Sequence, residues 1–103
     1  MDDVLWTDGL GERATLLQFS STFCAPCRAA RRVLSRAAAT LPGVVHRELD
    51  VADHPELADR AGITGTPTTL ILDSDGREVA RAEGAPSLPR VLATLDRVLG
   101  QRA

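Results

Sequence analysis

Residues 20–32 read SSTFCAPCRAARR and hold the only two cysteines of the chain, Cys24 and Cys27. A cysteine pair with a two-residue gap is typical of a local redox centre or of half a metal site, because two cysteines cannot form a disulfide framework. A structural zinc site needs four ligands, and the other soft ligands, His46 and His54, stand singly in the sequence. The pair therefore favours redox chemistry, and we expect no metal site.

The cysteine pair lies where a predicted strand is followed by a predicted helix. Residues 15–20 (TLLQFS) form a short, mostly apolar run, which indicates a buried strand. After the pair, apolar or small side chains recur at the spacing of one helix face, at Ala30, Val33, Leu34, Ala37, Ala38 and Leu41. Pro42 and Gly43 end this predicted helix. Cys24 is therefore expected at the start of a helix.

A cysteine at the start of a helix is well placed for thiol chemistry. The first amides of a helix have no partner within the helix, and the helix dipole favours negative charge there. We therefore expect a stabilised Cys24 thiolate, which is the form that attacks a disulfide sulfur. Pro26 fits the first helical turn, where its missing N–H costs nothing. Cys27, one turn further on, can then attack a mixed disulfide at Cys24 and release a reduced partner.

The rest of the chain continues the alternation of strands and helices. Further strands are predicted at residues 44–51, 68–73 and 77–83, the last two joined as a hairpin. A short helix is predicted from an N-cap at Asp53 to Gly62, and a last helix begins after Ser87. The order β-α-β-α-β-β-α predicts an α/β fold, with a mixed four-stranded sheet flanked by helices on both faces.

Length, composition and charge limit the possible classes of protein. The chain has 103 residues, of which 44% are hydrophobic and 25% charged, and its net charge is -2. These values predict one domain over residues 1–103 and favour neither nucleic acid nor an anionic membrane as partner. No apolar run approaches the roughly 20 residues of a membrane span, and the start MDDVLW does not resemble a signal peptide. We expect a cytoplasmic protein, or an extracytoplasmic one if a leader or anchor was removed.

Two stretches together resemble the thioredoxin family, namely LLQFSSTFCAPCRAARRVL (residues 16–34) and GITGTPTTLILDSDGREVARAEGA (residues 62–85). The resemblance rests on the strand–C-x-x-C–helix junction, on Thr66-Pro67 before a strand, and on Gly84-Ala85 before the last helix. It implies a thioredoxin-like fold and dithiol–disulfide exchange with disulfide-containing proteins. A thioredoxin-reductase-like protein would donate the electrons, and no cofactor other than the redox-active disulfide of the two cysteines is implied.

The same resemblance implies roles for individual residues. Cys24 would be the nucleophile, and Cys27 the resolving thiol. The Thr66-Pro67 peptide bond would be cis, although local sequence alone favours trans. The Thr66 backbone would pair with an extended segment of the partner. The docking surface would be lined by Phe23, Ala25, Pro26, Thr66, Pro67, Gly84 and Ala85.

Several positions depart from the usual pattern of the family. Ala25-Pro26 stands where Gly-Pro is common, and Ser20 and Phe23 stand in place of the usual tryptophans. The segment before the first strand is short, so the usual first strand and helix are largely missing. Strand 44–51 would then be an exposed edge, unless residues 4–6, as a short strand or an anchored arm, or another subunit cover it.

Two further departures concern proton transfer. Gln18 stands where the family usually has a buried aspartate, and Glu48 stands where that aspartate has a lysine partner. A glutamine amide cannot act as a base. Water or Glu48 would then take the proton of Cys27, unless Gln18 is simply a polar residue of the core.

Three functions remain open on the sequence alone. The favoured one is a thioredoxin-like protein-disulfide reductase that exchanges disulfides through Cys24 and Cys27. An oxidase or isomerase of an extracytoplasmic thiol pathway would use the same cysteines at a different reduction potential. A non-catalytic interaction module would keep the fold without turnover. Gln18 and the missing tryptophans favour this module, whereas the two cysteines and Pro67 count against it.

Overall fold

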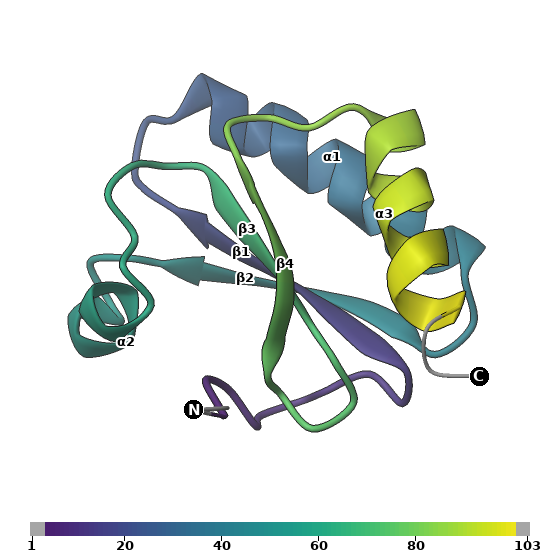
Figure 1. Cartoon of the computed structure of the whole chain (residues 1–103). Helices are drawn as coiled ribbons and strands as arrows, with labels where there is room; N and C mark the ends of the chain where they lie inside the picture. The colour runs from purple at the N-terminus through teal and green to yellow at the C-terminus, as the bar shows by residue number, and fades with distance from the viewer. Residues whose placement is uncertain (1–3, 101–103) are drawn as a thin grey trace.

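The structure is a computed structural model that describes residues 4–100 of the chain. Its elements follow the predicted order (Figure 1). They are β1 (Ala14–Ser20), α1 (Ala25–Thr40), β2 (Val44–Asp50), α2 (Pro55–Arg60), β3 (Thr68–Leu72), β4 (Glu78–Glu83) and α3 (Leu88–Gly100). The domain predicted over residues 1–103 extends at both ends beyond the described residues.

The strands form one four-stranded sheet in the order β2-β1-β3-β4. β1 runs parallel to β2, with Ala14 opposite Val44 and Ser20 opposite Asp50. This pair is parallel because α1 carries the chain back across the sheet between the two strands. β3 is antiparallel to both β1 and β4. The predicted mixed sheet is therefore confirmed.

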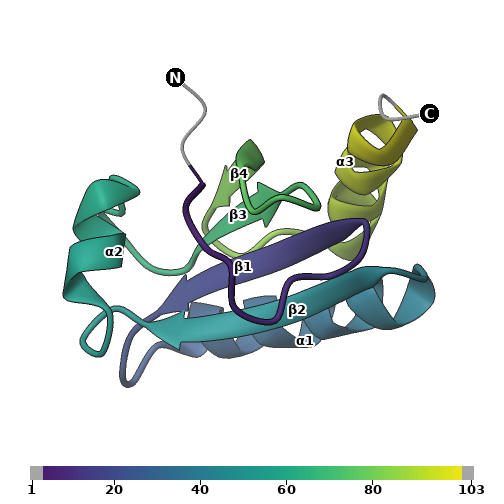
Figure 2. The ribbon, with the colours of Figure 1, turned by 90° about the horizontal axis from the view of Figure 1, so that it is seen from below.

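Helices cover both faces of the sheet, as Figure 2 shows. Successive side chains of a strand point to opposite faces, so Leu16 packs with α1 and α3 while Leu17 packs on the side of α2. All seven residues of β1 are buried, because β1 lies between two strands and two helical layers. The strand that leads to the cysteines is thus fully enclosed, as is its neighbour β3.

The start of α2 differs by one residue from the prediction. Asp53 was the expected N-cap, but His54 holds that position and its side chain makes no capping hydrogen bond. Pro55 begins the helix, and its ring fixes the backbone angle that a first helical residue needs. The His54 ring lies edge-on to Trp6, with ring centroids 5.8 Å apart. The prediction of an Asp53 cap was therefore wrong, because proline already sets this helix start.

The first described residues form an arm anchored at the turn between β3 and β4. Val4 bridges to Arg77, and the Leu5 N–H donates to the Gly76 carbonyl oxygen at 3.0 Å. Trp6 packs on the α2 side of the sheet. The arm does not pair with β2, which has β1 as its one strand neighbour within residues 4–100.

Truncating a core side chain of β1 tests this account of the fold. Leu17→Ala is expected to lower the free energy of unfolding by about 2–5 kcal/mol, because a cavity replaces a fully buried side chain. Val79→Ala on β4 is the control, since Val79 is 44% exposed. The control should lose less than about 1 kcal/mol in urea denaturation. Equal losses in the two variants would contradict the assigned core.

Candidate active site

Both cysteines lie at the junction between β1 and α1. Cys24 is the N-cap of α1, with an extended backbone (φ -114°, ψ 98°). Phe23, directly before it, has a left-handed backbone with φ 57°. A non-glycine residue in that region is strained by roughly 1–2 kcal/mol. The chain therefore turns sharply out of the sheet just before the first cysteine.

The two cysteines are joined by a disulfide, with Cα atoms 5.2 Å apart. Their environments differ: Cys24 is partly exposed, whereas Cys27 is only 1% exposed. The Cys27 N–H donates a hydrogen bond to the Cys24 sulfur at 3.2 Å. Negative charge on the Cys24 sulfur would therefore meet an amide donor and the positive end of the helix dipole. Cys24 is thus partly accessible, with an amide donor at its sulfur, while Cys27 is shielded.

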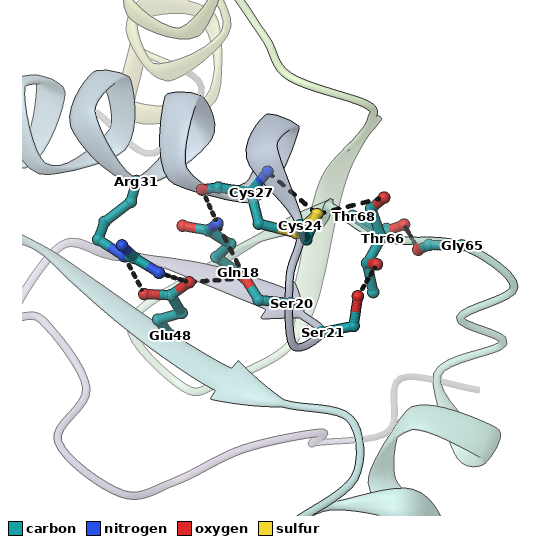
Figure 3. The surroundings of a disulfide bond; sticks show 10 residues. All are labelled: Gln18, Ser20, Ser21, Cys24, Cys27, Arg31, Glu48, Gly65, Thr66 and Thr68. Carbon is teal, nitrogen blue, oxygen red and sulfur yellow. Dashed lines mark hydrogen bonds and ion pairs between the residues drawn. A yellow bond between two sulfur atoms is a disulfide. The ribbon is translucent and has the colours of Figure 1, made fainter.

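The loop before β3 lies beside the disulfide (Figure 3). The Thr66-Pro67 peptide bond is cis, and the Thr66 carbonyl oxygen is 4.0 Å from the Cys24 sulfur. The hydroxyls of Ser21 and Thr66 share a hydrogen bond of 2.7 Å. The Gly84 N–H donates to the Pro67 carbonyl oxygen at 2.8 Å. Three segments far apart in the sequence thus meet at one corner of the molecule.

Most of the residues expected at the docking surface lie at the surface of this corner. The side chain of Phe23 is 97% exposed, an unusual state for a large apolar ring. Exposed neighbours in the same region are Ala25, Pro26, Gly84 and Ala85, and Thr66 is partly exposed. Pro67 is buried, so it can shape this surface without presenting its ring.

A buried polar network lies beneath Cys27 (Figure 3). Gln18 is fully buried, and its amide nitrogen donates to the Cys27 carbonyl oxygen at 2.9 Å and to the Ser20 hydroxyl at 3.0 Å. Its amide oxygen lies 2.9 Å from Nε2 of His46. Because a carbonyl oxygen only accepts, the orientation of the amide is fixed, and His46 must carry its proton on Nε2. Gln18 is thus a fully bonded, neutral residue under the second cysteine.

Glu48 joins this network from β2 through an ion pair. The Ser20 hydroxyl donates to Glu48 Oε2 at 2.7 Å, and the Arg31 guanidinium binds both carboxylate oxygens. Mainly because of the Arg31 hydrogen bonds, the pKa of Glu48 lies below its ordinary value, although burial opposes this shift. A paired carboxylate with a low pKa is a weak base. Glu48 is therefore poorly suited to take the proton of Cys27.

His46, for which the sequence predicted no role, belongs to this buried network. The pKa of His46 lies below its ordinary value, mainly because the ring is buried. The negative charge of Glu48 opposes this shift, and the positive charge of Arg31 adds to it. Its Nδ1 lies 3.1 Å from the Ser35 hydroxyl, which completes the hydrogen bonding of a neutral ring. Strand alternation could have found it, because His46 and Glu48 are two residues apart on β2 and share a face.

The shifts of these two groups predict how stability depends on pH. As the pH falls below the ordinary histidine value of 6.5, the unfolded chain binds a proton that buried His46 resists, so the free energy of unfolding falls. A second loss of the free energy of unfolding begins below the ordinary glutamate value of 4.5, because the unfolded chain then binds a proton that ion-paired Glu48 resists. His46→Gln keeps a donor for Gln18 and should remove the first loss. Urea denaturation at a series of pH values measures both, and an unchanged profile in H46Q would contradict the assignment.

The described residues contain no other evident chemical centre. Within residues 4–100, no three His, Cys, Asp or Glu side chains are grouped so that they could hold a metal ion. None of the helices described is both long and apolar enough to cross a membrane. The cysteine pair lies at a helix start after an inner strand of the sheet, and a cis-proline loop lies beside it. This arrangement defines the class of proteins that exchange dithiols and disulfides.

Comparison with known proteins identifies the family within this class. The family model described as Thioredoxin matches residues 6–97, and the chain therefore belongs to the thioredoxin family. It is 37% identical over 79 residues to a thioredoxin of Chlamydia muridarum, covering 77% of this chain and 76% of that protein. It is 31% identical over 86 residues to the putative thioredoxin 2 of Streptomyces coelicolor, covering 84% of this chain and 60% of that protein.

Solved structures agree with this assignment. Chloroplastic thioredoxin z superposes with a TM-score of 0.77 at 25% identity, covering 86% of this chain and 80% of that one. The thioredoxin of Fasciola hepatica superposes with a TM-score of 0.72 at 28% identity, covering 84% of this chain and 82% of that one. The chain is a thiol–disulfide oxidoreductase with a thioredoxin-like fold.

Proposed function

We propose that this protein reduces disulfides of partner proteins, with Cys24 as the attacking thiol and Cys27 as the resolving thiol. The observation that carries the proposal is the asymmetry of the pair. Cys24 is partly exposed and its sulfur accepts a hydrogen bond from the Cys27 N–H, whereas Cys27 is 1% exposed. A partner disulfide can reach the first sulfur, and the second can act only after the first has reacted.

The exchange proceeds in two displacement steps. The Cys24 thiolate attacks one sulfur of the partner disulfide, whose S–S bond breaks, and the other partner sulfur leaves as a thiolate that takes a proton. The Cys27 thiolate then attacks the Cys24 sulfur and releases the second partner thiol. The partner gains two electrons and two protons in the two steps, and the protein is left with the Cys24–Cys27 disulfide.

The partner segment is proposed to bind in an extended form at the Thr66 backbone. An extended peptide gains affinity from main-chain hydrogen bonds, and the Thr66 carbonyl oxygen lies 4.0 Å from the Cys24 sulfur. A segment paired there would bring its disulfide next to the attacking thiol. The exposed residues around it are Phe23, Ala25, Pro26, Gly84 and Ala85, and Pro67 would hold the loop in shape.

The remaining parts of the proposal concern protons and electrons. Water is the proposed acceptor of the Cys27 proton, because Gln18 is not a base and Arg31 keeps the pKa of Glu48 low. A thioredoxin-reductase-like protein would return electrons to the disulfide, with no further cofactor bound to this chain. The relatives among bacterial thioredoxins support a cytoplasmic location.

Single-cysteine variants test the assigned roles. Cys27→Ser should accumulate a mixed disulfide with a disulfide-containing test protein, because the resolving thiol is missing. Cys24→Ser should form none, since its remaining thiol is buried. Both variants should lose turnover in dithiothreitol-driven disulfide reduction, and non-reducing gels with mass spectrometry identify the adduct. Adducts formed mainly by C24S would reverse the two roles.

The reduction potential tests the direction of electron flow. A thioredoxin-type reductant has a potential near about -270 mV, whereas a strong oxidant lies near about -120 mV. We expect the Cys24–Cys27 couple below about -200 mV against a glutathione or dithiothreitol redox buffer. A value near that of the strong oxidant would assign the protein to the oxidase class instead.

A further inference from the structure

A groove separate from the disulfide lies between α3 and the sheet face formed by β3 and β4. Its volume is about 320 Å³, at the lower end of the roughly 300–1,000 Å³ typical of small-molecule sites. On β4, at the edge of the sheet, Ala80 and Ala82 present only methyl groups to the groove, which leaves space beneath α3. Its floor is apolar and is formed by Leu16, Leu34, Ile71 and Val91.

Thr69, whose buried hydroxyl has no partner within residues 4–100, is one of the residues that line this groove. Thr69 on β3 is 2% exposed, and its Oγ1 has no hydrogen-bond partner among the residues that the structure describes. Buried polar groups are nearly always hydrogen-bonded, because an unsatisfied one costs free energy. A ligand in the groove with a hydrogen-bond acceptor would satisfy this hydroxyl.

Two cations of α3 line the same groove without an acidic partner. Arg90 and Arg97 make no ion pair within residues 4–100, and no carboxylate lines the groove. Neither has an acidic residue three or four positions away along the helix, where a helical ion pair would form. The third lining cation, Arg81, is already bound by Glu78 and by the carbonyl oxygen of Ala61.

The register of the strands places the hydroxyl and one free cation at the same end of the groove. Thr69 is opposite Ala82 on β4, whereas Ile71 is opposite Ala80. α3 begins five residues after the end of β4, so Arg90 in its first turn lies toward the Thr69 end. Arg97 follows about 10 Å further along the helix axis, at a rise of about 1.5 Å per residue.

We propose that this groove binds a small amphipathic carboxylate. The carboxylate accepts hydrogen bonds from the Thr69 hydroxyl and the Arg90 guanidinium, and the hydrocarbon chain lies on the apolar floor toward Ile71. A charge-assisted hydrogen bond such as the one to Arg90 is stronger than one between neutral groups. Burial of the hydrocarbon chain on the apolar floor adds favourable hydrophobic free energy of binding. Arg97 covers the far end with its aliphatic stem and adds a weaker electrostatic attraction. The site uses neither cysteine, so it is independent of the proposed electron transfer.

Decanoate is the probe that tests the proposal on the full chain. Calorimetric titration should show saturable one-to-one binding, at least about tenfold tighter than binding of decanol or decylammonium. Comparison of the three probes separates the carboxylate from the hydrocarbon chain that they share. Absence of saturable decanoate binding, or equal affinity for decanol, would overturn the proposal.

Matched variants locate the site. Arg90→Gln should weaken decanoate binding about tenfold, and Arg97→Gln less, because only Arg90 reaches the carboxylate. Arg32→Gln on the exposed face of α1 is the charge-matched control and should leave binding unchanged. Thr69→Val should weaken binding severalfold yet raise Tm, because it removes an unpartnered buried hydroxyl. Equal binding by R90Q and R32Q, or full affinity in T69V, would contradict the site.

Discussion

The hydrogen bond from the Cys27 amide to the Cys24 sulfur is the contact on which the site depends. It exists because the chain leaves a fully buried strand and enters a helix within four residues. That junction makes Cys24 the N-cap, directs the Cys27 amide toward its sulfur and places Cys27 in the core. The Cys27 N–H would stabilise a thiolate on Cys24, and the same turn of the chain buries the Cys27 side chain. The two cysteines therefore differ in the way that an ordered exchange requires.

The network under Cys27 shows how a buried polar group can be kept without charge. Gln18 makes hydrogen bonds with both its nitrogen and its oxygen, and its partner His46 stays neutral because burial lowers its pKa. The charges of Glu48 and Arg31 are paired nearer the surface, with Ser20 between them and Gln18. The interior beneath the disulfide is therefore polar and fully bonded, but it holds no base suited to take a proton from the second cysteine.

Hydrophobic patterning predicted the strands, the long helix and the junction, because local spacing determines which face is buried. The motif then placed Cys24 correctly at the helix start. The N-cap was misassigned because Asp53 is a common capping residue, whereas Pro55 is the first residue of the helix and therefore makes His54 the cap. The partnership of His46 with Gln18 depends on the register between β1 and β2, which a single sequence does not specify. Likewise, the sequence marks Thr69 only as a strand residue, because its place at the groove and the lack of a partner for its hydroxyl among the described residues depend on the packing of α3.

The central claim is that the fold makes the two thiols unequal, and alkylation of the reduced protein tests it most directly. Iodoacetamide labelling at neutral pH, followed by tandem mass spectrometry, gives a separate rate for each cysteine of the unmodified chain. The account predicts that Cys24 reacts at least about tenfold faster than Cys27, because its thiolate is stabilised and accessible. Equal rates, or faster reaction at Cys27, would contradict it.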